Sequence, residues 1–78
     1  MRELIEYIAS SLVDDPSQIE IRQFRRGSHV TFKLRVAKGD MGRIIGKDGR
    51  VANAMRILLR VSSAQEGQQA TLDVIEPR

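Results

Sequence analysis

The chain has 78 residues, of which 41% are hydrophobic and 29% are charged, and its formal net charge is +3. This length allows one compact domain, and the composition excludes both a disordered chain and a low-complexity repeat. The absence of cysteine excludes disulfides and thiolate zinc sites, and no apolar run approaches the roughly 20 residues of a membrane span, so we expect a cytoplasmic protein.

The first third of the chain predicts a helix followed by a strand. Apolar residues recur at helical spacing over residues 2–13, which indicates an amphipathic helix, and Pro16 with its polar neighbours ends it. Residues 19–25 then predict a strand whose two isoleucines share one face. Phe24 is out of phase with them, which leaves open either a bulge near Gln23 or a change of exposed face.

A second strand and a short helix follow. Apolar and polar residues alternate strictly over residues 30–36, which predicts a strand with one buried face and one wet, basic face that carries Lys33 and Arg35. Asp40 is then placed to cap a short helix over residues 41–45, with its carboxylate accepting hydrogen bonds from the first turn.

The last third predicts a longer helix from residue 50 to about Ala64 and a closing strand at residues 70–74. Ile57 lies on the otherwise basic side of this helix, where it could cover a groove or enter a contact with another protein. The core stripe expected on this helix is Val51, Ala54, Met55, Leu58 and Val61, flanked by Leu59.

The most informative segment is the sequence Ile-Ile-Gly-Lys-Asp-Gly-Arg between the short and the long helix. Gly46 and Gly49 enclose only two residues, so the chain reverses sharply with its backbone uncovered. Bare N–H groups beside Lys47, Arg50 and a helix start predict a site for an anion, although Asp48 subtracts some positive charge.

Basic residues are concentrated in the middle of the chain. From Arg22 to Arg60 there are eleven Lys and Arg but only two acids, which favours a nucleic-acid partner. The only aromatic residues are Tyr7, Phe24 and Phe32, so base stacking worth about 1–3 kcal/mol per base has no platform near the glycines. We therefore expect weak and loosely specific binding by one copy.

The element order and the glycine loop together resemble a KH domain of the prokaryotic type. This type II domain is an α+β fold with the order αββααβ, in which helices pack on one face of a three-stranded sheet. The resemblance covers residues 1–78 as a single KH domain with its GxxG loop at 46–49, and it is strongest from Gly39 to Arg60. Among such domains the chain is most similar to the single-domain KhpA family of small bacterial RNA-binding proteins.

The resemblance implies a binding site for single-stranded RNA. In KH domains the GxxG loop clamps about four nucleotides by their backbone, while the bases lie across an apolar groove. Part of the second strand would form the far wall of that groove, and which isoleucine touches a base stays open. The implied RNA-binding residues are Gly46, Lys47, Asp48, Gly49, Arg50, Ile44 and Ile45, with Arg43, Lys33 and Arg35 as an extension of the RNA path.

The resemblance further implies a homodimer and pairing with a second KH-containing protein, in a post-transcriptional regulator or RNA chaperone. The alternative is a protein-interaction scaffold in which RNA binding is secondary, and single-stranded DNA stays open as a ligand. We expect no catalytic residue, no metal, no cofactor and no membrane contact. His29 is the only histidine and has no companion base or ligand in the sequence.

Overall fold

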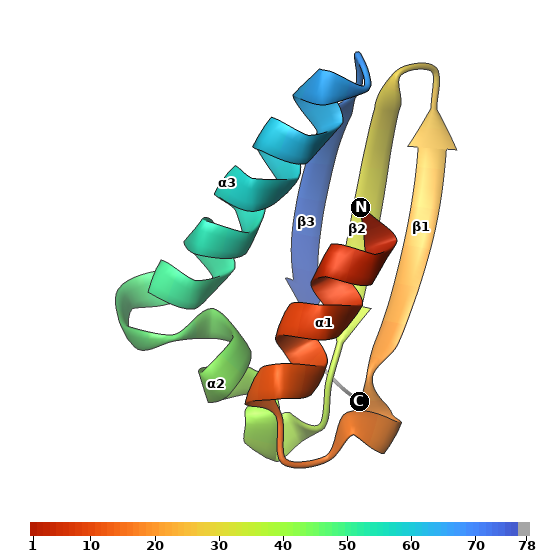
Figure 1. The fold of residues 1–78 in the computed structure, drawn as a ribbon. Helices are drawn as coiled ribbons and strands as arrows, with labels where there is room; N and C mark the ends of the chain where they lie inside the picture. The colour runs from red at the N-terminus through yellow and green to blue at the C-terminus, as the bar shows by residue number, and fades with distance from the viewer. Residues whose placement is uncertain (77–78) are drawn as a thin grey trace.

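The computed structural model describes residues 1–76 and contains three α-helices on one face of a three-stranded sheet (Figure 1). The predicted α+β class and element order are confirmed. Single turns of 3₁₀ helix precede β1, α2 and α3. The helices and strands are α1 (Arg2–Leu12), β1 (Glu20–Arg26), β2 (His29–Arg35), α2 (Met41–Ile45), α3 (Arg50–Gln65) and β3 (Gln69–Ile75).

Strand β2 lies in the centre of the sheet, antiparallel to β1 and parallel to β3. The β1–β2 register is continuous over the whole of both strands, so it contains no bulge. Phe24 pairs with Thr31 and lies on the face that the helices leave open, whereas Ile21 lies on the helix face. The exposed position of the Phe24 side chain therefore follows from the regular alternation of side chains along β1.

The core lies between the helices and the sheet, as the strict alternation along β2 predicts. Every second residue of that strand is fully buried, and α1 covers them with one narrow apolar side. The buried hydrophobic residues are Ile5, Ala9, Ile21, Val30, Phe32, Leu34, Val36, Ile44, Ala52, Met55, Leu59 and Leu72.

The core stripe predicted on α3 is only partly confirmed: Met55 is buried and Val51 packs against the core, but the rest of the stripe is shifted in phase. Leu58 and Val61, which were expected inside, are 46% and 56% exposed. Helix α3 is apolar on two sides, so the helical period alone does not decide which side meets the sheet. In the observed orientation the Arg56 Nε donates to the Leu72 carbonyl of β3 at 3.1 Å. The buried residues of α3 are Ala52, Met55, Leu59 and Ser63.

Candidate nucleic-acid interface

The loop between α2 and α3 is held in a left-handed conformation. The φ angles are 77° at Gly46, 57° at Asp48 and 75° at Gly49. A Cβ atom added at Gly46 would lie 2.4 Å from Val51 Cγ2 and 2.9 Å from Val51 N, so only glycine fits there. At Gly49 the surrounding space is open, and glycine is favoured there by φ alone.

The backbone donors of this loop differ from those expected. The Gly46 N–H donates to the Gly42 carbonyl at 2.8 Å, and the Gly49 N–H donates to the Gly46 carbonyl at 3.2 Å. The interpretation that these two N–H groups face a phosphate is therefore corrected, because both have partners in the loop. The N–H groups of Lys47 and Asp48 have no acceptor within residues 1–76, and they precede the positive end of α3.

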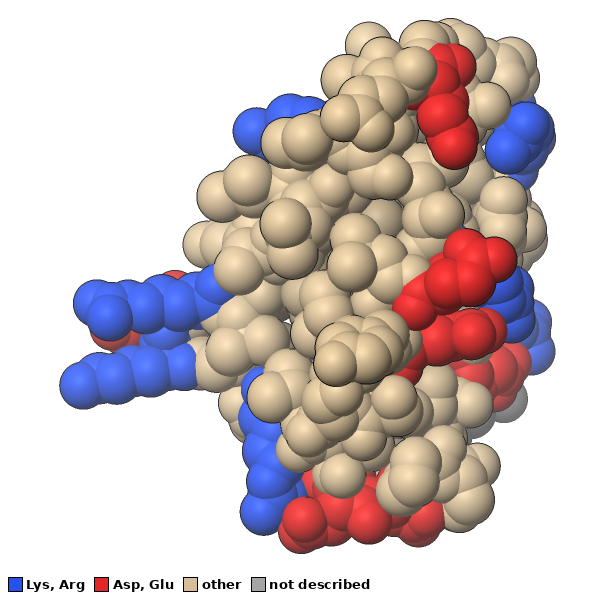
Figure 2. Space-filling model, viewed as in Figure 1, with Lys and Arg blue, Asp and Glu red and all other residues tan. Residues whose placement is uncertain are grey.

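The side chains of the loop are exposed and unpaired. Lys47, Asp48 and Arg50 form no ion pair with any residue that the structure describes. Figure 2 shows Lys and Arg projecting at the α2–α3 end of the molecule, while Asp and Glu gather over α1 and the turn that follows it. Two unpaired cations beside free backbone donors make this loop suitable for a phosphate.

The paired isoleucines have different environments. Ile44 is fully buried, so it can only support the surface from beneath, whereas Ile45 is 39% exposed. Ile45 lines a hollow of about 290 Å³ together with Lys38, Met41 and Glu76. Strand β2 contributes no residue to this hollow, because its helix-facing side chains are buried in the core.

Asp40 has a different role from the helix cap predicted for it. Its side chain makes no capping bond to α2 and instead points to the connection between α1 and β1. There it accepts hydrogen bonds from the N–H groups of Asp14 at 3.0 Å and Asp15 at 3.2 Å. Arg43 Nη1 donates to the same carboxylate at 3.0 Å, and Arg43 Nη2 lies 3.1 Å from Asp14 Oδ2.

These four residues, Asp14, Asp15, Asp40 and Arg43, form what we call the α2 latch. The pKa of the Asp40 carboxyl is lowered, chiefly by the hydrogen bond from the Asp14 N–H, while burial acts in the opposite direction. Further donation from Asp15 and Arg43 adds to the lowering. The latch therefore keeps a buried carboxylate charged, and it ties the start of α2 to a segment about 25 residues earlier.

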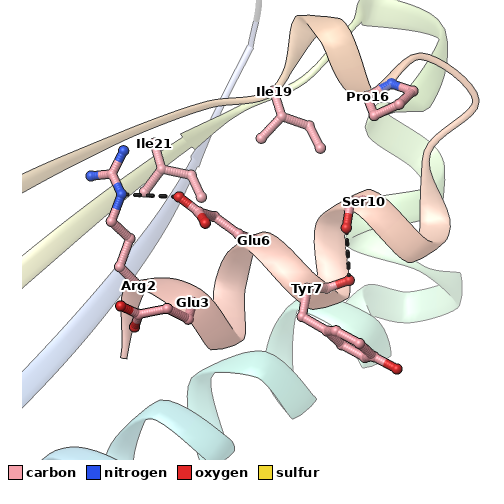
Figure 3. A pocket seen from close by; sticks show the side chains of 8 residues that line it. All are labelled: Arg2, Glu3, Glu6, Tyr7, Ser10, Pro16, Ile19 and Ile21. Carbon is pink, nitrogen blue, oxygen red and sulfur yellow. Dashed lines mark hydrogen bonds and ion pairs between the residues drawn. The ribbon is translucent and has the colours of Figure 1, made fainter.

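Another hollow, of about 480 Å³, lies away from the loop, between α1 and the start of β1 (Figure 3). Arg2 and Glu6 form an ion pair of 3.1 Å across its edge, and the Tyr7 ring points away from it. Its acidic character does not suit a phosphate. The residues that line it are Arg2, Glu3, Glu6, Tyr7, Ser10, Pro16, Ile19 and Ile21.

The residues expected to extend the RNA path divide between the loop and the opposite face of the sheet. Arg43 lies in α2 beside the loop, but both of its terminal nitrogens contact acids. Lys33 and Arg35 lie on the open face of the sheet, away from the helices. Among residues 1–76 there is no cluster of metal-ligating side chains, and no helix in that range is long and apolar enough to cross a membrane.

Comparisons with known proteins agree with one another. A family model described as the KhpA/KhpB KH domain matches residues 2–74. The RNA-binding protein KhpA of Chlamydia trachomatis is 36% identical over 78 residues, the full length of both chains. KhpA of Clostridium acetobutylicum is 35% identical over 75 residues, and KhpA of Listeria monocytogenes is 41% identical over 76 residues. These matches cover 96% and 97% of this chain and all of each relative.

Proposed function

The chain belongs to the KhpA/KhpB family of KH domains, and from this membership we propose that it binds single-stranded RNA by clamping the strand at the Gly46–Gly49 loop. Its relatives are named RNA-binding proteins, which supports RNA as the ligand. The proposed role is post-transcriptional regulation or RNA chaperoning in the cytoplasm, without enzymatic activity.

One observation carries the loop assignment. Lys47 and Arg50 are exposed cations without an acidic partner in the described chain, and they flank the free N–H groups of Lys47 and Asp48. A phosphate bound between Lys47 and Arg50 would accept charge-assisted hydrogen bonds from both side chains. The glycines hold this conformation, and Asp48 weakens the attraction through its own charge.

The apolar part of the proposed site lies beside the loop. Bases of the clamped strand would lie over Ile45, with Ile44 as the buried support beneath. Arg43 is half-exposed and close to this path, but its contacts with Asp14 and Asp40 offset its charge. We therefore propose that the main role of Arg43 is to position α2.

The test of the clamp is the Lys47→Asp variant. Its RNA binding, measured by fluorescence polarisation, is expected to be abolished while its thermal melt stays that of the wild type, because the side chain is exposed and unpaired. Arg25→Asp, at an exposed position of β1, is the matched control and is expected to bind nearly normally. A folded Lys47→Asp variant with undiminished binding would disprove the clamp.

We also propose that the chain forms a homodimer through an outer α3 face, made of Ala54, Ile57, Leu58 and Val61. The exposed fractions of its three large residues are 55%, 46% and 56% in chain order, and their spacing places them on one side of the helix. Ile57 thus shares this side with two other exposed apolar residues. This favours the interpretation that Ile57 enters a contact with another protein over the interpretation that it covers a groove. Two copies can bury the same side against each other about a twofold axis.

The dimer is tested by light scattering coupled to size-exclusion chromatography. The Ile57→Glu variant is expected to elute as a folded monomer, while Gln65→Glu, at an exposed position on the same helix, retains the dimer. A monomeric wild type at high micromolar concentration would contradict the proposal. The same face is where we expect a second KH-containing protein to pair.

The scaffold alternative makes a different prediction. Cross-linking followed by sequencing of the bound RNA is compared between the wild type and the Lys47→Asp variant, alongside affinity capture of protein partners. RNA enrichment that depends on Lys47 supports the clamp. Protein partners captured equally by both, with no RNA enriched over the variant, favour the scaffold.

A further inference from the structure

No helix among residues 1–76 covers the opposite face of the sheet (Figure 1). The pairing of β1 with β2 places Arg22 beside Lys33, and Glu20 beside Arg35, on this face. Phe24 follows along β1 with its side chain half-exposed. We call Glu20, Arg22, Phe24, Lys33 and Arg35 the open-face cluster.

The cluster contains a hollow with a positive charge. A space of about 160 Å³ is lined by Glu20, Arg22, Lys33, Arg35 and Ile75. Glu20 accepts from Arg22 Nε at 2.6 Å and lies 3.6 Å from Arg35 Nη1, so one carboxylate serves two guanidinium groups. Three cations around one acid leave a surplus of two positive charges.

A donor in this hollow lacks a partner. Arg35 Nε is buried and has no hydrogen bond to any of residues 1–76, and an unmet buried donor costs free energy. Asp73 lies opposite Lys33 on β3 but forms no ion pair with it within the same range. An anion of phosphate size in the hollow would be attracted by the surplus positive charge of the residues that line it.

Phe24 supplies the stacking surface that the glycine loop lacks. Its ring is 50% exposed, and the Lys33 ammonium lies 5.4 Å from the ring centroid. An exposed aromatic ring beside basic side chains is the arrangement by which single-stranded nucleic acids are held, with a base on the ring and phosphates on the cations.

We propose that the open-face cluster is a second contact site for the single-stranded RNA bound at the Gly46–Gly49 loop. This proposal rests on the proposed function, because it concerns the same strand. The loop accommodates about four nucleotides, whereas the longest extent of the molecule is 35 Å. A strand of about twelve nucleotides, within the roughly 4–16 that one single-strand-binding domain covers, is long enough to contact both sites.

The experiment compares oligonucleotides of these two lengths, about four and about twelve nucleotides. The wild type is expected to bind the longer one more tightly. Arg22→Gln/Lys33→Gln is expected to lose about fivefold in affinity per missing phosphate contact at roughly 0.1 M salt, for the longer oligonucleotide only. The control Arg2→Gln/Arg25→Gln removes two exposed charges on the helix side of the sheet. This variant is expected to bind the longer oligonucleotide more tightly than the shorter one, as the wild type does.

A second variant reports on stacking without removing charge. Phe24→Trp, at a half-exposed site, is expected to fold, and its fluorescence should be quenched by the longer oligonucleotide but not by the shorter one. Equal losses in the two double variants, or no gain with length, would overturn the second site. If the shorter oligonucleotide still binds in a manner that depends on Lys47, the loop proposal survives that result. The loop proposal fails separately if Lys47→Asp has no effect.

Discussion

Charged side chains are paired on one side of α2, a helix of only five residues, and unpaired on the other. At its start, Asp40 and Arg43 are paired with each other and with the α1–β1 connection, through four contacts of 3.0 to 3.2 Å. Past its end, Lys47 and Arg50 are exposed and unpaired within residues 1–76. The difference teaches that cations only a few residues apart can be neutralised within the fold or left exposed. It is the exposed pair, beside N–H groups without an acceptor in residues 1–76, that we propose as the phosphate site.

The largest effect is expected from replacing the glycine that ends α2. Gly46→Ala adds a Cβ that collides with Val51 and forces a left-handed φ on alanine, which should cost roughly 2–6 kcal/mol of unfolding free energy. Gly49→Ala has room for its Cβ and should cost about 1–2 kcal/mol. Urea unfolding measures both, and equal losses would show that the close approach to Val51 is unimportant.

The next largest effects are expected from a substitution in the α2 latch and from one in the glycine loop, and they should differ in kind. Asp40→Asn replaces an acceptor by an amide donor facing the N–H of Asp14 or Asp15, so the melting temperature and, through a displaced loop, the RNA affinity should both fall. Lys47→Gln should lower the affinity alone. Differential scanning fluorimetry and fluorescence polarisation measure the two quantities. A normal melt for Asp40→Asn would contradict the latch.

The salt dependence of RNA binding gives a smaller and more specific effect. The log–log slope should decrease in magnitude by about 0.7 in Lys47→Gln, because one phosphate contact is lost. Arg43→Gln should keep the wild-type slope even if its affinity falls, since its charge is already offset by acids. Titrations at several salt concentrations separate the two, and a reduced slope for Arg43→Gln would place it on the RNA path.

The smallest effect is on acid stability. The pKa of Asp40 is lowered below its ordinary value of 3.8 in the folded chain, so its contribution is fully present above that value and is lost as the pH falls through the lowered pKa. The stability difference between the wild type and Asp40→Asn should be constant near neutral pH and shrink below about pH 4. Denaturant melts at stepped pH measure this difference. A difference that grows on acidification would have the wrong sign.

Local patterns in the sequence predicted most of the fold. The bounds of α2 agree with the prediction at both ends, since Gly46 stops the helix. The wet and buried faces of β2 follow from alternation alone. The phase of α3 was mispredicted because its two apolar sides compete, and the outcome depends on contacts such as that of Arg56 with β3.

The sequence indicates which residues make up the candidate loop but not which interactions they form. The partners of Asp40 lie 25 and 26 residues earlier, so a pattern that compares neighbours assigns it to the nearest helix start. Likewise, the donation of the Gly46 and Gly49 N–H groups inside the loop depends on backbone angles that glycine permits but does not require. The second site that we propose on the sheet could be recognised only from the register of β1 against β2.

The parallel pairing of β2 with β3 has a consequence for the order of folding. Parallel neighbours need a long crossover, and here that crossover consists of α2, the glycine loop and α3. The hairpin of β1 and β2 can close early through local contacts, whereas β3 cannot dock until the crossover has compacted. The segment proposed to bind RNA is therefore also the one whose closure completes the sheet, and we expect substitutions that strain its backbone, such as Gly46→Ala, to slow folding.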